Sequence, residues 1–377
     1  MAAIHHIALT DFRSYRQLDF DLGGQSAYLY GPNGAGKTNL LEALSILNPG
    51  RGLRGAAFGE LGRRSVDEAS ADQKPRPWGV GARLGEGIEA IDLATGSDPR
   101  DLTRRLVRID QQTVPATRLL EHLRLVWLTP AQDRIFIEAR SERLRFFDRL
   151  VYAAVHDHAH QVNLYEKAQR ERLKLLIDSH ADPVWLDGLE ARMTEAGLAI
   201  IDARRTTLET LQLEINAHTS AFPKSIMTLT GDHQAIDNSE ELEGFLRDGL
   251  KAARPRDAAA GRSLFGPHRS DLSVIHADKG RPASECSTGE QKALILNMIL
   301  AQGARLARDP KSPKPVILLD EVAAHLDPIR RHALFDETGA LGLQTLFTGT
   351  DLSLFDGLKS KALGVRVEAS QLIEISD

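Results

Sequence analysis

Hydrophobic and polar residues change their spacing twice along this chain, which predicts three regions. In residues 1–125 the apolar positions alternate with polar ones, as over residues 18–22, or form short blocks that are typical of strands. In residues 126–255 they repeat at helical intervals over long stretches, and residues 256–377 return to short apolar runs between helical patterns. We therefore expect an α/β fold that is divided by an α-helical insertion.

The middle region contains two long helical patterns. They cover residues 141–179 and 184–221, with Asp182 and Pro183 between them. A short connection that contains a proline favours an antiparallel pair of helices. Each helix would extend roughly 55 Å at 1.5 Å per residue. This region is therefore predicted to form an arm.

A phosphate-binding motif lies in the first region. It consists of Gly31, Pro32, Asn33, Gly34, Ala35, Gly36, Lys37 and Thr38, which match the P-loop pattern G-x-x-x-x-G-K-[ST]. Residues 26–30 predict a strand before the loop, and residues 39–47 predict a helix after it. In such a loop Lys37 reaches the β- and γ-phosphates of ATP, and the Thr38 hydroxyl binds Mg²⁺. The sequence therefore predicts an ATP site.

A buried strand that ends in two acidic residues is predicted far from the P-loop. Residues 315–319 form an apolar run that leads into Asp320 and Glu321. In a P-loop ATPase the aspartate holds Mg²⁺, and the glutamate is the catalytic carboxylate that orients or deprotonates water. Because Lys37 and Asp320 must meet at one Mg–ATP, we expect the two ends of the chain to form one ATPase head, interrupted by the arm.

A third motif precedes the apolar helix pattern at residues 293–300. Its residues are Ser287, Thr288, Gly289 and Glu290. They fit a capping box, which places a free serine hydroxyl at the positive end of a helix. An ordinary capped helix explains the same residues. Their position shortly before the acidic strand is that of the signature motif of ABC-type ATPases, which contacts ATP held by a second subunit. We therefore expect a head-to-tail homodimer.

Taken together, these segments resemble the RecF family of bacterial DNA replication and repair proteins, which are short relatives of SMC-type ATPases. The resemblance rests on the P-loop, the signature motif and four further segments: Asp-Phe-Arg-Ser-Tyr at 11–15, residues 143–148, Gly-Pro-His-Arg-Ser-Asp-Leu at 266–272, and residues 319–327. It covers most of the chain. P-loops occur in many families, whereas the segments at 266–272 and 319–327 are more specific.

The resemblance implies a DNA-binding protein with weak ATPase activity that uses ATP and Mg²⁺. An ATP-driven homodimer would clamp DNA at single-strand gaps and junctions, with RecR, RecO and RecA as partners in recombinational repair, replication restart and the SOS response. The implied location is the cytoplasm, at the nucleoid. By position, Arg13 lies near the nucleotide, Asp327 lies in the D-loop at the dimer interface, and Ser287 and Gly289 act in trans.

Two positions distinguish the chain from ABC transporters. Gln132 follows the apolar run at 125–128 and is our candidate for the Q-loop residue that binds Mg²⁺ or water, although an ordinary loop glutamine also fits. The strand predicted at 344–347 is followed by Thr348, where transporters carry a histidine. The missing group predicts slow turnover and argues against a transporter subunit. An ATPase–nuclease of the OLD type is the other alternative, and we expect no nuclease domain after Glu321.

Composition limits the partners. The 377 residues carry a net charge of −5 and one cysteine. One cysteine fits a reducing compartment, and no apolar stretch approaches the ~20 residues that span a bilayer, so we expect no membrane association. A nucleic-acid site would have to be local. Arg140, Arg143 and Arg145, near the root of the arm, are the candidates, although such clusters are more often solvated helix faces.

Overall fold

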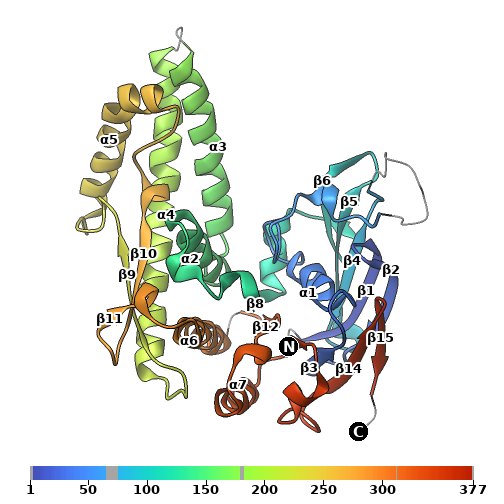
Figure 1. Ribbon diagram of the computed structural model, residues 1–377. Coiled ribbons are helices and arrows are strands. Elements are labelled where there is room, and N and C mark those ends of the chain that lie inside the picture. Colours follow the sequence, from blue (N-terminus) through green and yellow to red (C-terminus); the bar gives the residue numbers. More distant parts are fainter. Residues whose placement is uncertain (1–2, 65–74, 179–181, 311, 376–377) are drawn as a thin grey trace. The chain divides into compact units, whose positions relative to one another are not determined.

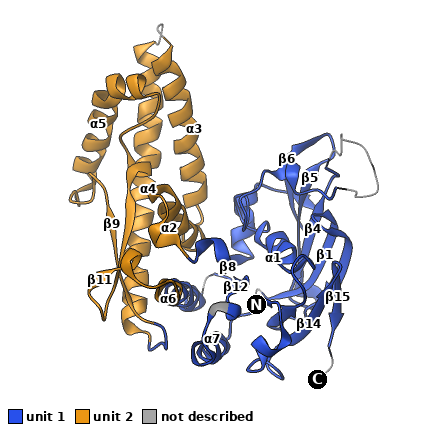
Figure 2. Ribbon diagram, viewed as in Figure 1, with its two compact units in different colours: residues 1–133, 219–222, 295–377 blue, residues 134–218, 223–294 orange. Residues whose placement is uncertain are grey.

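The computed structural model describes residues 3–64, 75–178, 182–310 and 312–375. The chain forms two compact units (Figures 1 and 2). Unit 1 comprises residues 1–133, 219–222 and 295–377, and unit 2 comprises residues 134–218 and 223–294. Both ends of the chain therefore contribute to unit 1, as the distribution of the ATPase motifs predicts.

The central sheet of unit 1 is mostly parallel and has the strand order β15-β14-β3-β13-β12-β8. The strands are β3 (Ala27–Tyr30), β8 (Arg124–Leu128), β12 (Pro315–Leu319), β13 (Thr345–Gly349), β14 (Leu363–Glu368) and β15 (Gln371–Glu374). Strands β8, β12 and β13 are buried along their whole length. Such continuous burial is typical of parallel strands that are covered on both faces, and it explains why their sequences are mostly apolar.

A second sheet in unit 1 is antiparallel and has the order β2-β1-β4-β5-β6-β7. The strands are β1 (Ile4–Phe12), β2 (Tyr15–Asp21), β4 (Gly79–Leu84), β5 (Ile91–Asp98), β6 (Asp101–Ile109) and β7 (Gln112–Thr113). Helix α1 (Lys37–Ser45) contacts strands of both sheets and shares one hydrophobic core with them. The P-loop helix is thereby held between two sheets. Helix α7 (Pro328–Ala340) also belongs to unit 1.

Unit 2 consists of helices around a small antiparallel sheet of order β11-β10-β9. The elements are α2 (Arg140–Ala154), α3 (His158–Ile177), α4 (Pro183–Ala217), β9 (Ser225–Thr230), α5 (Ser239–Ala260), β10 (Asp271–His276) and β11 (Arg281–Pro282). Helices α3 and α4 lie side by side as the predicted hairpin, and α5 packs against both (Figure 1). Helix α6 (Thr288–Ala307) begins in unit 2 and ends in unit 1. No helix among the described residues is long and apolar enough to cross a lipid bilayer.

A buried arginine connects the three long helices of unit 2. The guanidinium of Arg172 on α3 donates to Glu190 Oε1 on α4 (2.7 Å) and to Asp257 Oδ2 on α5 (2.6 Å). It also donates to the carbonyl oxygen of Leu250 (2.7 Å). Because removal of one partner would leave a buried charge unpaired, this cluster fixes the register of α3, α4 and α5.

Two features of unit 2 differ from the sequence prediction. The helix predicted over residues 141–179 is two helices, because Val155 leaves the helical conformation (φ −120°, ψ 106°) and α3 starts at His158. The predicted boundary at residue 255 falls inside α5, which continues past Pro255 to Ala260. The arm unit extends to residue 294 because α5 and the β9–β11 sheet pack with the arm helices.

Candidate nucleotide-binding site

The P-loop joins β3 to α1 in the predicted strand–loop–helix arrangement. Gly31 and Gly36 have φ angles of 154° and 115°, which glycine adopts readily. A Cβ at Gly31 would lie 2.1 Å from the Val367 carbonyl oxygen, and one at Gly36 would lie 2.9 Å from the Tyr15 hydroxyl. The same Tyr15 hydroxyl donates to the Gly36 carbonyl (3.1 Å). The path of the loop therefore requires both glycines.

The Lys37 ammonium lies inside this loop. Its Nζ donates to the carbonyl oxygens of Gly31 (2.7 Å) and Pro32 (2.9 Å), and the side chain is buried. Burial lowers the pKa of Lys37, and the negative fields of Glu321 and Asp320 oppose that shift. The ammonium therefore lies close to both acidic residues, as a phosphate-binding lysine of this class requires.

Asp320 joins the two ends of the chain at one point. Its Oδ1 accepts hydrogen bonds from the hydroxyls of Thr38 (2.9 Å) and Thr348 (2.8 Å). Burial raises the pKa of this carboxyl, while the two hydroxyl hydrogen bonds lower it. No lysine or arginine in the described ranges forms an ion pair with it. A buried carboxylate beside a hydroxyl, with no cationic partner, is a donor set that suits Mg²⁺.

Thr348 positions both acidic residues, and sequence reasoning missed this role. Its hydroxyl donates to Asp320 and accepts the backbone N–H of Glu321 (2.8 Å), and the side chain is fully buried. Glu321 follows β12 with a left-handed φ of 51°. The available signal was a threonine at the carboxyl end of the strand next to β12, where ligands of open α/β sheets bind.

Gln132 lies at the same end of the sheet. It ends a short 3-10 helix that follows β8, and β8 pairs with β12 so that the Leu128 carbonyl accepts the Asp320 N–H (2.9 Å). The Gln132 side chain is buried, and its Oε1 accepts the Thr129 N–H (3.2 Å). Gln132 is thus next to the acidic strand, and its role as a ligand stays a prediction.

Arg13 is held on the P-loop helix. It has a left-handed φ of 51°, and its Nε and Nη2 donate to the two carboxylate oxygens of Glu42 (3.0 and 2.8 Å), which is fully buried in α1. Arg54 donates to the same carboxylate (3.1 Å) and to Asn39 Oδ1 (2.8 Å). The field of Arg54 also lowers the pKa of Asp320. Two arginines against one glutamate leave a positive excess near the loop, and no motif in the sequence points to Arg54.

The signature motif starts α6 within unit 2. The predicted capping box is present, since Ser287 N–H donates to Glu290 Oε2 (2.9 Å) and Glu290 N–H donates to Ser287 Oγ (3.4 Å). Hydrogen bonds from Lys279 and from the Ser287 backbone lower the pKa of Glu290 to about 2. Ser287 and Thr288 are exposed. Asp327, also exposed, caps α7 by accepting the Arg330 N–H (2.9 Å).

The three arginines predicted to contact DNA differ in their surroundings. Arg143 donates through Nε (2.8 Å) and Nη2 (2.5 Å) to both carboxylate oxygens of Asp271, and Arg145 donates to Glu142 (2.6 Å). Within the described part of the chain, Arg140 forms no ion pair. Arg143 and Arg145 are thus paired with carboxylates and Arg140 is not, and contact with DNA stays a prediction for all three.

Known proteins support the fold. A family model described as "AAA domain, putative AbiEii toxin, Type IV TA system" matches residues 27–348. The DNA replication and repair protein RecF of Caulobacter sp. (strain K31) is 53% identical, over 100% of this chain and 99% of that relative.

Solved structures support the same fold. The recombination mediator protein RecF-ATPrS of the RecFOR pathway has a TM-score of 0.81 at 21% identity, covering 99% of this chain and 98% of the other. The Smc head domain of Pyrococcus furiosus, solved with the C-terminal domain of ScpA, has a TM-score of 0.53 at 15% identity and covers 100% and 97%. The predicted fold, an ABC-type ATPase head divided by a helical arm, is confirmed.

Proposed function

This chain belongs to the RecF family of DNA replication and repair proteins, within the wider AAA-domain family, and we propose that it is an ATP-gated clamp on DNA. The observation that carries this proposal is the hydrogen bond between Thr38 and Asp320 (2.9 Å). It brings the phosphate-binding loop and the acidic strand, from opposite ends of the chain, into one site.

Each residue of the site has a chemical role in this proposal. Lys37 exchanges its two loop carbonyls for phosphate oxygens, and Thr38 and Asp320 hold Mg²⁺. When bound, Mg²⁺ neutralises charge on the phosphates. Glu321, whose backbone is fixed by Thr348, orients and deprotonates the attacking water. Because no histidine follows β13, one charge-stabilising group is missing, and hydrolysis is slow.

Two such heads close head to tail around two ATP molecules. The exposed Ser287 hydroxyl and the positive end of α6 from one protomer contact the γ-phosphate in the P-loop of the other. Asp327 lies at the interface between the protomers. The exposure of Ser287 and Thr288 supports this arrangement, because a signature motif that acts in trans has to be accessible.

The clamp acts at single-strand gaps and duplex–single-strand junctions, and it helps RecR and RecO to place RecA on DNA. Family membership supports this role, and so does the fold shared with a recombination mediator of the RecFOR pathway. The same membership argues against the transporter and ATPase–nuclease alternatives. DNA stimulates the slow hydrolysis, which releases the clamp.

The test uses the Glu321→Gln variant, which should bind ATP and hydrolyse it very slowly. Its affinity for a gapped duplex is measured by fluorescence anisotropy with and without Mg–ATP, and its mass is measured by light scattering. We expect tight DNA binding and a dimer only with ATP. The matched control is Lys37→Ala in the same background, which should lose the response to ATP. Equal binding in both conditions would contradict ATP gating, and a monomer in saturating ATP would contradict the sandwich.

A further inference from the structure

The Gly-Pro-His-Arg segment at residues 266–269 belongs to unit 2 and contributes nothing to the nucleotide site described above. Residues Pro267–Arg269 form a short 3-10 helix that leads into β10. The segment presents two sides. One side forms hydrogen bonds with the arm helices α3 and α4. The other side carries Arg269, which lines a cavity.

The fixed side is held by buried polar contacts. Gly266 has a φ of 123°, and a Cβ there would lie 2.1 Å from the Tyr165 hydroxyl, so only glycine fits. The Pro267 carbonyl accepts a hydrogen bond from Arg204 Nη1 on α4 (2.7 Å). The His268 ring accepts from the Tyr165 hydroxyl on α3 through Nδ1 (3.2 Å). The position of the segment is therefore determined by α3 and α4.

Helix α2 fixes the same segment from another direction. Arg143 near the start of α2 binds both carboxylate oxygens of Asp271, which lies two residues after the segment and starts β10. Asp148, further along α2, binds Arg204 through both of its oxygens (2.7 and 2.9 Å). Residues 143–148 and 266–272, which both carried the sequence resemblance, thus hold each other. Arg143 serves this assembly and is not free for a ligand.

The other side of the segment carries uncompensated positive charge. Arg269 and Arg140, the first residue of α2, line a small cavity of about 130 Å³ together with Asp232 and Ser270. Burial lowers the pKa of Arg269, and the positive fields of Arg140 and Arg262 lower it further. Across the described residues, none of the three arginines forms an ion pair. Three guanidinium groups near a single carboxylate form a site that attracts an anion.

We propose that Arg140 and Arg269, supported by Arg262, bind a phosphate of the DNA backbone, so that the Gly-Pro-His-Arg segment is a DNA-contact element of the arm. This inference rests on the proposed DNA clamp. Guanidinium groups bind phosphate oxygens in bidentate pairs. The amino end of α2, where Arg140 lies, adds the positive field of a 15-residue helix. The 130 Å³ cavity can admit a group of phosphate size.

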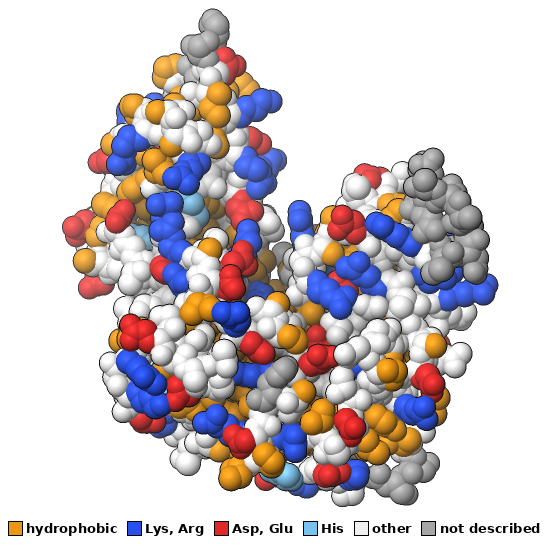
Figure 3. All heavy atoms as spheres, viewed as in Figure 1, with side chains coloured by type: hydrophobic (Ala, Val, Ile, Leu, Met, Phe, Trp, Pro, Cys, Tyr) orange, Lys and Arg blue, Asp and Glu red, His pale blue; other side chains and the backbone are white. Residues whose placement is uncertain are grey.

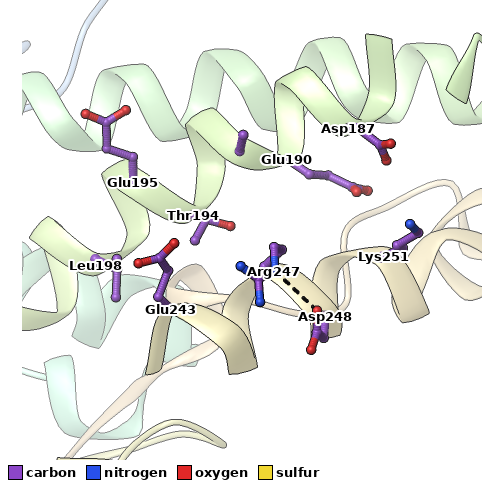
Figure 4. Close-up of a pocket in the computed structure, with 10 residues that line it drawn as sticks. Asp187, Glu190, Thr194, Glu195, Leu198, Glu243, Arg247, Asp248 and Lys251 are labelled. Atoms are coloured by element: carbon purple, nitrogen blue, oxygen red, sulfur yellow. Dashed lines mark hydrogen bonds and ion pairs between the residues drawn. The ribbon is translucent and has the colours of Figure 1, made fainter. Parts of the chain in front are cut away.

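The remaining surface of unit 2 favours this location. A groove of about 490 Å³ between α4 and α5 is lined by five carboxylates and two cations. Arg172 and Arg254 pair with two of these carboxylates, Glu190 and Asp187, so the groove carries no positive excess that would attract a phosphate backbone. Figure 4 shows that the carboxylates come from both helices, with Asp187, Glu190 and Glu195 on α4 and Glu243 and Asp248 on α5. Figure 3 shows basic and acidic side chains intermixed on the face it displays. Because the displayed face has no broad basic surface, the Arg140–Arg269 cluster is the better candidate for a phosphate site.

The test compares two double variants that lose the same charge. Arg140→Gln with Arg269→Gln removes the proposed contacts. Arg170→Gln with Arg247→Gln removes two exposed arginines that pair with carboxylates on their own helices. Both are made in the Glu321→Gln background, and gapped-duplex affinity is measured with Mg–ATP between about 50 and 200 mM salt.

We expect the Arg140/Arg269 variant to bind DNA roughly tenfold or more weakly than the parent, with a salt dependence shallower by about one phosphate contact. The second should bind within about twofold of the parent.

Three outcomes of this experiment would each contradict a different part of the proposal. If the parent protein binds DNA and the Arg140/Arg269 variant has the same affinity and salt slope, the proposed phosphate site is wrong and the proposed DNA clamp is unaffected. If the parent itself fails to bind DNA with ATP, the clamp fails and the site fails with it. Loss of ATP affinity or of the ATP-dependent dimer in the Arg140/Arg269 variant would assign these residues to another role and overturn the DNA contact. Replacement of both by lysine should restore only part of the affinity, because lysine returns the charge without the bidentate geometry.

Discussion

One threonine hydroxyl, that of Thr348, contacts both acidic residues of the candidate nucleotide site. Thr348→Val keeps the shape of the side chain, but Asp320 loses a donor and the Glu321 N–H loses its acceptor. We expect kcat for ATP hydrolysis to fall roughly 10–100-fold, because such supporting contacts orient the groups that react. ATP affinity should change by less than about threefold, since the P-loop contacts remain. Steady-state kinetics and nucleotide titration measure the two effects separately.

The control for this prediction is Thr348→Ser, which keeps the hydroxyl and should keep most of the activity. If the valine variant keeps the parental kcat, the hydroxyl has no positioning role, and a loss in the serine variant alone would assign the effect to packing of the methyl group. Thr348 is fully buried, so both variants need a thermal melt to show that the fold is intact.

A half-buried histidine, His268, makes the stability of unit 2 depend on pH. Burial lowers the pKa of His268 from 6.5 to about 4. Between these values the unfolded chain binds a proton that the folded chain does not, so stability is complete above pH 6.5 and is lost as the pH falls toward 4. His268→Gln should reduce the loss in unfolding free energy between about pH 7 and 4.5 by roughly 2 kcal/mol. Urea denaturation at the two pH values measures this.

His160→Gln, at an exposed position on α3, is the matched variant and should leave the pH dependence unchanged. Part of the dependence will remain in His268→Gln, because burial also lowers the pKa of His233 to about 4. A pH dependence identical to that of the parent would show that folding does not lower the pKa of His268.

At the scale of single residues, the sequence predicts those residues whose roles follow from a local motif. The P-loop pattern located Lys37 and Thr38, and the acidic strand located Asp320, because the spacing within each motif is local. Thr348 could not be found in this way, since its role depends on β13 pairing with β12. Arg143 looked available for DNA because its partner Asp271 lies 128 positions away.

Helix α1 is fixed at both ends, and the end away from the P-loop depends on β6. Arg105 on β6 donates to the carbonyl oxygens of Ile46, Asn48 (3.1 Å) and Gly50 (3.2 Å), just after the helix. Burial lowers the pKa of Arg105 to about 10. A cation at the carboxyl end of a helix is favourable, because the unpaired carbonyl groups there carry partial negative charge.

We therefore expect Arg105→Met to lower the unfolding free energy by roughly 2–4 kcal/mol, because the carbonyl oxygens lose charged donors. Arg104→Met changes an exposed residue of the same strand and should cost less than about 0.5 kcal/mol. Urea denaturation of both variants provides the comparison. Equal stabilities would mean that water replaces the guanidinium without loss, and that β6 does not support the P-loop helix.

The elements that sequence patterns predicted share one property: their burial is local and continuous. Strands β8, β12 and β13 are buried throughout and mostly apolar, and they were predicted within a residue or two. Strand β6 is mostly polar and partly exposed, and it is a strand because it pairs with β5. The division between α2 and α3 was missed because Val155, where the helical path is interrupted, is itself an apolar residue in register with the pattern.

At the scale of the whole molecule, the ATPase motifs are divided between the two units, and this division determines how the sites of a dimer would be composed. The P-loop and Asp320 belong to unit 1, whereas Ser287 lies in unit 2 and is exposed. If Ser287 serves the ATP of a partner, a head-to-tail dimer has two sites, each made of one P-loop and one signature motif. Damage to a P-loop and damage to a signature motif are then separable when they are placed on different protomers.

A mixing experiment tests this arrangement. Lys37→Ala removes the phosphate-binding ammonium, and Ser287→Asp keeps a good helix cap but places a negative charge against the γ-phosphate. Each variant alone should be inactive. In an equal mixture, half of the dimers are mixed and each of these has one intact site, so about a quarter of the parental ATPase activity should return.

The control is a protein that carries both changes, mixed with the parent, in which every mixed dimer has two damaged sites. Activity should then fall to about a quarter of the parental level, the share of dimers made of parent alone. If Ser287 instead acted on the ATP of its own chain, the two single variants would stay inactive when mixed. The double variant would then leave about half of the activity. The pair of mixtures therefore distinguishes action in trans from action in cis, and with it the sandwich dimer from a self-contained ATPase.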